Sequence, residues 1–274
     1  MNKTEQYYRK VANHFDEDAR LFEQRYEENP VLQKIRWDFR NHTEKFAFSN
    51  ALEIGCGPGI DMVHFCKNYP DKNIYGIDVS EKMVSIAQKN LEQEKLSNGV
   101  VKQGSVEDIP ALFPGKKFDL IFVYFGGLNT VYDLKATIKT LREVVTDNAT
   151  FILTNVNRYY VMDVFIKLLK LKFSEMFARF QNRWKGYSPG RDLPSNVYSY
   201  NTIKQAVEPE FKIIHKRGYS ILYPPWYASG YLKKLSFLEK PLWKFDELLQ
   251  KSPFWNNGEY SLYILKAQPK ASEQ

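Results

Sequence analysis

The chain has 274 residues, of which 26% are charged and 15% aromatic, and its formal net charge is +7. A chain of this length can bury a large apolar core as one domain, with or without an insertion, so its fold needs no disulfide or metal as a staple. Its only cysteines are Cys56 and Cys66, which excludes a disulfide framework and a four-ligand zinc site, and no metal is expected.

The first 25 residues are polar and charged, and no stretch approaches the roughly 20 apolar residues of a membrane span, so we expect neither a signal peptide nor a transmembrane segment. Two reduced thiols indicate a cytoplasmic protein, peripheral to a membrane at most. The positive charge favours an anionic partner, which is nucleic acid, a phosphorylated substrate or an anionic membrane. The aromatic content favours an apolar or planar substrate, or an aromatic core. The oligomeric state is left open.

Residues 4–48 predict two helices separated by the Asn-Pro pair at 29–30, the first with apolar or aromatic positions at Tyr8, Val11, Phe15 and Phe22. From residue 49 onward, short apolar runs alternate with helical segments. We expect strands over residues 51–54, 73–77, 100–103, 119–125 and 150–155, and helices over residues 60–67, 81–94 and 133–145, with Ser80 as an N-cap. Strands joined by helical crossovers are parallel, so this alternation predicts a doubly wound α/β sheet.

A helix over residues 202–207 and strands over residues 211–221 and 260–267 complete a seven-stranded, mostly parallel sheet whose last strand is antiparallel. Two segments interrupt this pattern, and connections of their length are usually lids or binding elements. We therefore predict a core domain made of residues 1–155, 201–221 and 259–268, including the N-terminal helices, and cap insertions over residues 156–200 and 222–258.

The first insertion contains a strongly amphipathic stretch over residues 160–185. Its apolar face consists of Met162, Phe165, Ile166, Leu169, Phe173, Met176, Phe177, Phe180 and Trp184. Its basic residues, which outnumber Asp163 and Glu175, are Lys167, Lys170, Lys172, Arg179, Arg183 and Lys185. The stretch is either a lid helix with a solvated basic face or an interfacial helix that delivers a lipidic substrate from an anionic membrane. The second insertion repeats this composition with Trp226, Tyr227, Tyr231, Phe237 and Trp243, so the two insertions together would roof an aromatic-lined pocket.

The stretch LEIGCGPG, residues 52–59, follows the first expected strand and precedes a helix. A strand, a glycine loop and a helix form the nucleotide cradle of open α/β sheets. The phosphate-binding loop is excluded because no Gly-Lys-Ser/Thr end is present, and the dinucleotide fingerprint fails because Ile60 occupies the place of its third glycine. The spacing is instead E-x-G-x-G-x-G, with Glu53 followed by glycines at 55, 57 and 59.

This stretch resembles motif I of the class I S-adenosylmethionine-dependent methyltransferases, and an acidic first residue suits the positive charges of that cofactor. The resemblance implies that Asp78, at the end of NIYGID, accepts the ribose hydroxyls, and that Val79 and Met83 lie against the adenine. GSVEDIP, residues 104–110, is similar to the loop that reads the adenine amine. Ser105 replaces the usual Asp there, so this contact falls to Glu107, Asp108 or main-chain carbonyls.

FDLIFVYFGGLN, residues 118–129, resembles motif IV, the fourth strand and the loop beneath the reactive sulfur. The likeness covers residues 4–155 and the last two strands, in the manner of the ubiquinone/menaquinone-type small-molecule methyltransferases, and implies a Rossmann-like fold. The cofactor-binding set it implies is Glu53, Gly55, Cys56, Gly57, Gly59, Asp78, Val79, Met83, Ser105, Val106, Glu107, Tyr124, Phe125, Gly126 and Tyr8. Tyr8 is included because related enzymes close an N-terminal helix over the cofactor with an aromatic residue.

Methyl transfer from a sulfonium is an in-line displacement in which the protein aligns the reactants and excludes water. Tyr124 and Asn129, at the end of the fourth strand, are the candidates for catalytic positioning. Arg36 or Arg40 could pair with the cofactor carboxylate. None of the four histidines belongs to a motif that would make it a general base.

The predicted function is therefore methylation of a hydrophobic or aromatic small molecule by S-adenosylmethionine, with S-adenosylhomocysteine as product. Methylation at oxygen is favoured, and nitrogen or carbon is possible. The alternatives are an RNA or protein methyltransferase that uses the basic surface and a non-catalytic protein that binds the same cofactor. Nucleic acid is disfavoured because residues 124–127 read YFGG where base-methylating families carry a tetrapeptide such as NPPY.

Overall fold

The computed structural model describes residues 2–169, 171, 173, 193–234 and 236–269. It begins with two helices, α1 (Lys3–Glu27) and α2 (Pro30–Thr43). A capping box between Asn2 and Glu5 starts α1. The Asn29 side chain caps α2 by accepting hydrogen bonds from the next two free amides, and Pro30 occupies its first turn, where a missing N–H costs nothing.

A seven-stranded sheet forms the centre of the molecule, in the order β3-β2-β1-β4-β5-β7-β6. The strands are β1 (Asn50–Ile54), β2 (Asn73–Asp78), β3 (Gly99–Gln103), β4 (Phe118–Val123), β5 (Val145–Val156), β6 (Phe211–Tyr219) and β7 (Tyr260–Ala267). β7 is antiparallel to both of its neighbours, and the pairs from β3 to β5 are parallel. The predicted doubly wound, mostly parallel sheet with an antiparallel last strand is confirmed.

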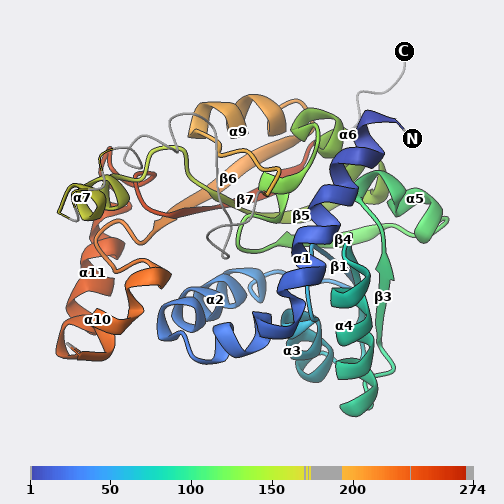
Figure 1. Cartoon of the computed structure of the whole chain (residues 1–274). Helices are drawn as coiled ribbons and strands as arrows, with labels where there is room; N and C mark the ends of the chain where they lie inside the picture. Colours follow the sequence, from blue (N-terminus) through green and yellow to red (C-terminus); the bar gives the residue numbers. More distant parts are fainter. Residues whose placement is uncertain (1, 170, 172, 174–192, 235, 270–274) are drawn as a thin grey trace.

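Alternating strand residues bury the two faces of the sheet against different helices. On one face, Ala51 and Phe122 pack with residues of α1, α2, α3 (Ile60–Asn68) and α4 (Glu81–Gln93). On the other face, Leu52 and Val123 pack with residues of α5 (Ile109–Leu112), α6 (Leu134–Val144) and α9 (Tyr200–Val207). The result is a helix–sheet–helix sandwich, and α1 runs obliquely across it beside α4 (Figure 1).

Three strand boundaries differ from the prediction by two residues or more. β6 ends at Tyr219 instead of residue 221, because Ser220 has a positive φ of 57°. The fourth strand ends at Val123 instead of residue 125, because Phe125 and Gly126 both have positive φ values, 52° and 80°, which no strand can continue. A short 3-10 helix, η2 (Gly127–Thr130), follows. The fifth strand begins at Val145, five residues before the predicted start, because Val145 already pairs with Phe118 across a register shift.

The described parts of the two insertions are helical. They comprise α7 (Val161–Leu169), η4 (Trp226–Ala228), α10 (Ser229–Lys234), η5 (Ser236–Leu238) and α11 (Glu239–Leu249), and Figure 1 shows the three α-helices on one side of the molecule. Most of the amphipathic stretch beyond Leu169 lies outside the described residues, including Lys170, Lys172 and residues 174–185. The division into core and cap segments stays a prediction. No helix among the described residues is long and apolar enough to cross a membrane.

The second insertion is anchored by a buried carboxylate. Asp246 on α11 accepts hydrogen bonds from the amides of residues 221, 222 and 223 at 2.6 to 3.0 Å. Trp243 packs edge-on against the Tyr223 ring. Since buried amides need acceptors, one side chain of α11 fixes the turn that leaves β6.

Candidate active site

The glycine loop joins β1 to α3 through three left-handed residues, Gly55, Gly57 and Gly59, with φ values of 66°, 53° and 81°. At Gly59 a Cβ atom would lie 3.0 Å from the Cβ of Ala87 on α4. At Gly55 and Gly57 the nearest atoms to such a Cβ are 3.8 and 3.9 Å away. The first two glycines therefore leave open space for a ligand beside bare backbone, whereas the third allows α3 and α4 to approach each other.

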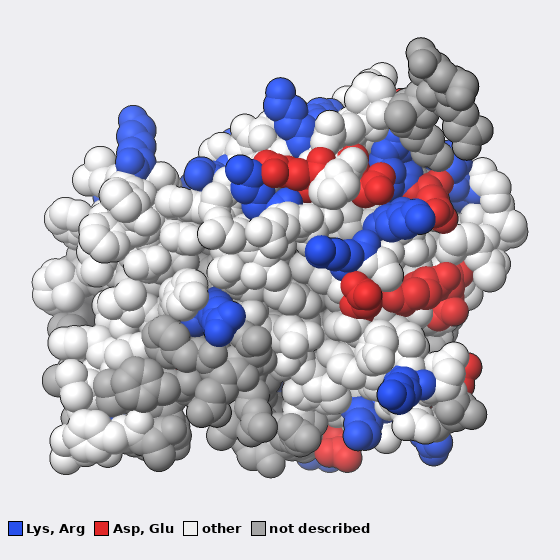
Figure 2. Space-filling view, turned by 90° about the horizontal axis from the view of Figure 1, so that it is seen from above, with Lys and Arg blue, Asp and Glu red and all other residues white. Residues whose placement is uncertain are grey.

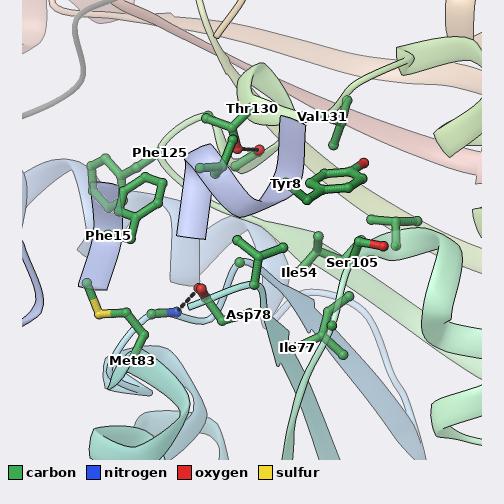
Figure 3. Close-up of a pocket in the computed structure, with 18 of the residues that line it drawn as sticks. Tyr8, Phe15, Ile54, Ile77, Asp78, Met83, Ser105, Phe125, Thr130 and Val131 are labelled. Carbon is green, nitrogen blue, oxygen red and sulfur yellow. Dashed lines mark hydrogen bonds between the residues drawn. The ribbon is translucent and has the colours of Figure 1, made fainter. Parts of the chain in front are cut away.

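A cavity adjoins this loop at the carboxyl ends of β1, β2 and β4, where ligands bind in open α/β sheets. Figure 3 shows Asp78 and Met83 on one side of it and Tyr8 and Phe125 among its other walls. The described lining residues are Tyr8, Val11, Phe15, Phe22, Ile54, Gly55, Gly57, Ile77, Asp78, Val79, Met83, Gly104, Ser105, Val106, Tyr124, Phe125, Gly126, Gly127, Thr130 and Val131.

Asp78 ends β2 and ties two loops together at the cavity wall. Its Oδ2 accepts the Gly57 amide and its Oδ1 accepts the Ser80 amide, both at 2.9 Å (Figure 3 draws the first bond). Burial raises the pKa of Asp78 to about 6 in spite of these bonds. Because a carboxylate can accept about four hydrogen bonds, Asp78 can receive two ribose hydroxyls without releasing either amide.

The predicted adenine end has Val79, Met83, Ser105 and Val106 at the cavity wall. The two acidic candidates for the amine contact have other partners. Glu107 does not line the cavity, and its Oε1 accepts the Tyr8 hydroxyl at 3.0 Å. Asp108 accepts both the amide and the hydroxyl of Ser105 at 2.8 Å. Of the three alternatives, the geometry therefore favours main-chain carbonyls for reading the adenine amine, and this assignment stays a prediction.

Helix α1 covers the cavity and is fastened by side-chain hydrogen bonds along its length. The Tyr8 hydroxyl donates to Glu107 and accepts the amide of Tyr132 at 3.4 Å. About two turns further along α1, Asp16 accepts the Ser80 hydroxyl at 2.6 Å. Val11, Phe15 and Phe22 line the cavity from the same helix. From this helix the sequence analysis assigned only Tyr8 to the cofactor site. The helical spacing of Val11, Phe15 and Phe22 was the signal that could have added them.

Glu53 lies behind the glycine loop and is absent from the described lining residues. It is 3% exposed, and its Oε2 has no hydrogen-bond partner within the part of the chain that the structure describes. Burial and the neighbouring Asp61 raise the pKa of Glu53 well above its ordinary value. Cys56 also lines no part of the cavity, because its side chain is buried in the core.

Arg36 and Arg40 are held by a residue that sequence reasoning missed. Asp61, in the first turn of α3, accepts Nη1 of Arg36 and Nε of Arg40, the latter at 2.7 Å. All three side chains are at least four-fifths buried. The sequence signal for this role was an acidic residue in the first turn of the helix that follows the glycine loop. Of the two arginines expected at the cofactor carboxylate, only Arg36 lines a cavity among those described, and that cavity is a second one beside the first.

The two predicted catalytic residues direct their polar groups away from the cavity. The Tyr124 ring lines it, but the hydroxyl lies 2.5 Å from Oγ1 of Thr43 in the core. Asn129 is fully buried and does not line the cavity, and its amide bonds to the main chain of residues 156 and 196. The physical reason is the early end of β4, because the two left-handed residues at 125 and 126 turn the loop. Phe125, Gly126 and Gly127 face the cavity instead.

Phe125 has an unusual conformation for a bulky residue, with φ at 52°. Its ring packs against Phe39 and Tyr260 at centroid distances of 5.1 and 5.6 Å, and the Arg36 guanidinium lies 4.8 Å from its centre. Packing on three sides over-determines the strained backbone. This side chain lines both cavities.

Comparisons with known proteins agree with this geometry. Residues 47–212 match the family model described as a methyltransferase domain. A malonyl-[acyl-carrier protein] O-methyltransferase of Ilyobacter polytropus is 24% identical, with 75% of this chain and 70% of that protein covered. A demethylmenaquinone methyltransferase of Porphyromonas gingivalis is 25% identical, with 57% and 61% covered.

The fold also matches a solved structure. The crystal structure of an S-adenosylmethionine-dependent methyltransferase from Clostridium acetobutylicum superposes with a TM-score of 0.55 and 16% identity, covering 85% of this chain and 90% of that one. The glycine loop and the cavity beside Asp78 lie at the carboxyl ends of the strands, where open α/β sheets bind their ligands. The chain therefore belongs to the class I S-adenosylmethionine-dependent methyltransferases.

Proposed function

We propose that the chain methylates a hydrophobic or aromatic small molecule, with an oxygen atom as the favoured acceptor. The observation that carries this proposal is the composition of the cavity. Apart from glycines, Asp78 and two hydroxyl residues, its described walls are apolar or aromatic, with Phe15, Phe22, Tyr124 and Phe125 among them. Such walls suit a flat or greasy acceptor and exclude water from the reacting atoms.

The named relatives support this class of acceptor. One is described by its action on demethylmenaquinone and the other on malonyl-[acyl-carrier protein]. The demethylmenaquinone name specifies a small molecule, the other a malonyl group carried by a protein, and neither specifies RNA. We take from them the small-molecule class and leave the individual acceptor to experiment.

The residues of this chain contribute alignment more than proton transfer. The bound cofactor supplies a methyl group on a positively charged sulfur, which keeps the electron pair of the broken carbon–sulfur bond. Among the described residues that line the cavity there is no His or Lys, and Asp78 is the one carboxylate. The backbone at 55–57 and 126–127 would hold the methionine part, Asp78 the ribose, and Phe125 the space beyond the sulfur.

Contact of the cap with an anionic membrane is a second part of the proposal. On α7, Phe165 and Leu168 are 52% and 45% exposed, and on α11, Phe245 and Leu248 are 53% and 70% exposed. Lys244 and Lys251 lie on or beside α11 and are also exposed. Apolar residues beside lysines are typical of interfacial helices. Such a contact would let a cytoplasmic enzyme take a lipidic acceptor from the membrane surface.

Flotation with vesicles tests the membrane part. Full-length chain should float with vesicles that contain phosphatidylserine and remain unbound with vesicles of phosphatidylcholine alone. The double variant Phe245→Ser/Leu248→Ser should lose this binding while keeping its affinity for S-adenosylhomocysteine. Equal flotation of the variant and the parent chain would contradict the proposed contact between the cap and the membrane.

The face shown in Figure 2 gives no support for an RNA acceptor. On the face in Figure 2, Lys and Arg of the described residues are interspersed with Asp and Glu and form no continuous stripe. Nucleic-acid binding rests on clustered basic residues that neutralise phosphates. On this face the described residues form no such cluster.

Transfer of a radiolabelled methyl group tests the function itself. The chain is incubated with labelled S-adenosylmethionine and with separate pools of phenols, aromatic carboxylic acids, quinols, tRNA and unfolded protein. Label should appear in an organic-extractable small molecule, and the Asp78→Ala variant should show none. Label confined to the tRNA or protein pools would contradict the proposed acceptor class.

A further inference from the structure

Arg36, on α2, is a buried cation that contacts three separate elements around the cofactor cavity. It is 6% exposed. Its Nη1 donates to Asp61 in the first turn of α3. Its guanidinium lies 4.4 Å from the centre of the Tyr26 ring on α1 and 4.8 Å from the centre of the Phe125 ring. One side chain therefore joins the helix after the glycine loop, the helix that covers the cavity and the loop after β4.

The loop after β4 depends on its packing because the backbone of Phe125 is strained. A φ of 52° is an outlier for a bulky residue, and such a conformation persists only where the surroundings over-determine it. Phe39 and Tyr260 pack against the ring at centroid distances of 5.1 and 5.6 Å. The planar Arg36 guanidinium adds a contact from α2, and a flat cation stacks on an aromatic face better than an ammonium on a flexible stem does.

The position of Phe125 matters because the next two residues form part of the cavity wall. Gly126 and Gly127 line the cavity together with Phe125. A Cβ atom on Gly55 of the glycine loop would lie 3.8 Å from the Cα atom of Gly127, so the two backbone segments lie against each other. A shift of Phe125 would move the wall beside the glycine loop. Misplacement by about 1 Å is enough to slow a reaction that needs aligned groups.

The glycine loop has support that does not involve Arg36. Arg40 donates from Nε to Asp61 at 2.7 Å and from Nη2 to the main-chain carbonyl of Ile60 at 3.1 Å. Asp61 therefore keeps a buried ion-pair partner if Arg36 is replaced. Loss of the Arg36 guanidinium should disturb Phe125 more than it disturbs the glycine loop.

We propose that Arg36 is a positioning residue for methyl transfer, which holds Phe125 and the backbone at 126–127 in a fixed place beside the glycine loop. It acts through Phe125 and contacts neither the cofactor nor the acceptor. This role differs from the pairing with the cofactor carboxylate that the sequence suggested. It concerns methyl transfer to any acceptor, so it does not depend on the acceptor class proposed above.

Kinetics of Arg36→Lys test this role. Lysine keeps the positive charge beside Asp61 but lacks the flat face that stacks on the rings. The assay uses full-length chain and whichever acceptor pool takes up the labelled methyl group. We expect the rate at saturating S-adenosylmethionine to fall about tenfold or more, and the affinity for S-adenosylhomocysteine to stay within about threefold of the parent. A rate within about threefold of the parent would overturn the proposal.

Arg142→Met is the matched control for a purely structural effect. Arg142 is 3% exposed, forms an ion pair with Asp147 at 3.0 Å and donates to the carbonyl of residue 268. It lies near the amino end of β5, whereas the cavity lies at the carboxyl ends of the strands. This variant should lose stability and keep both the rate and the cofactor affinity.

A double-mutant cycle shows whether Arg36 acts through Phe125. Residues that act as a unit have non-additive effects. In the Phe125→Leu chain, Arg36→Lys should therefore slow methyl transfer by less than about threefold. The full tenfold loss in that background would contradict the proposed route.

Binding of the cofactor carboxylate is the competing role for Arg36. 5′-Methylthioadenosine lacks the amino-acid part of S-adenosylhomocysteine, so it serves as the reference ligand in calorimetry. If the guanidinium bound the carboxylate, Arg36→Lys would weaken S-adenosylhomocysteine alone, by about tenfold or more. That result would make the positioning role wrong, whereas small and equal changes for both ligands support it.

Fluorine NMR tests the proposal without an acceptor. Failure of every pool to take up label would contradict the proposed function and leave this measurement intact. With 4-fluorophenylalanine placed at position 125 alone, we expect one sharp resonance in the parent chain and in Arg142→Met. Arg36→Lys should show a broadened resonance or more than one. A single, equally sharp resonance in Arg36→Lys would mean that Phe125 is held without Arg36, and the proposal would fall.

Discussion

Replacement of Asp78 by Ala separates its two tasks, which are holding the loops and holding the ribose. The substitution leaves the Gly57 and Ser80 amides, each now 2.9 Å from a carboxylate oxygen, without that acceptor. Each buried amide left unsatisfied costs about 1–3 kcal/mol. The loss is reduced because the carboxylate is itself disfavoured by burial, which raises its pKa to about 6. We therefore expect the free energy of unfolding to fall by about 2 kcal/mol.

Cofactor binding should suffer more than folding. Two ribose hydroxyls that donate to a charged acceptor contribute about 1.5–3 kcal/mol each, so the affinity for S-adenosylhomocysteine should fall at least about a hundredfold. Calorimetry measures the affinity, and urea denaturation measures the stability.

Asp119→Ala is the matched control for this experiment. Asp119 also accepts two main-chain amides, those of Ser49 and Asn50 at 2.9 to 3.0 Å, but it lies near the start of β4, away from the cavity. This variant should lose stability and keep its affinity. An Asp78→Ala chain that binds S-adenosylhomocysteine within about threefold of the parent would refute the ribose assignment.

Three other predictions follow from the same geometry. The folded-state pKa of Asp78, about 6, lies above the ordinary 3.8, so this group favours folding most below about pH 4 and its contribution decreases as the pH rises to 6. Cofactor affinity has the opposite trend because the ionised form accepts the hydroxyls. Calorimetry should show about a tenfold loss between pH 7 and pH 5, and a constant affinity would contradict this reasoning. Gly59→Ala places a Cβ atom at a residue with φ of 81°, where it would lie 3.0 Å from the Cβ of Ala87. This variant should lower the free energy of unfolding by about 2 kcal/mol or more. Gly115→Ala, with φ at 71° and open space around it, should cost only about 1 kcal/mol. Tyr124→Phe should reduce stability by about 1 kcal/mol and leave the methyl-transfer rate within about threefold, whereas a larger rate loss would restore a catalytic role to the hydroxyl.

Local patterns were sufficient for the elements and the cofactor cradle. Ser80 was predicted as an N-cap and accepts the Met83 amide at 3.1 Å. The glycines at 55, 57 and 59 were predicted to form the loop between the first strand and the helix after it, and all three are left-handed. These features depend on residues a few positions apart, so the chain itself encodes them.

Side-chain direction in the loop after β4 was not predictable in the same way. Tyr124 and Phe125 are adjacent aromatic residues, and nothing in their order indicates that one hydroxyl bonds to Thr43 while the other ring lines two cavities. That choice follows from the positive φ at Phe125, which packing against α2 and β7 stabilises.

The sequence by itself determined the doubly wound sheet, the glycine loop and the carboxylate at the end of β2, because spacing along the chain decides which groups reach the carboxyl edge of a parallel sheet. The resemblance of these motifs to a known family implied the cofactor. Only the tertiary structure decided that Asp61 holds Arg36 and Arg40, that α1 is fastened over the cavity, and that a second, smaller cavity lies beside the first. Those arrangements join residues distant in sequence, and their energies depend on burial, which no local pattern reports.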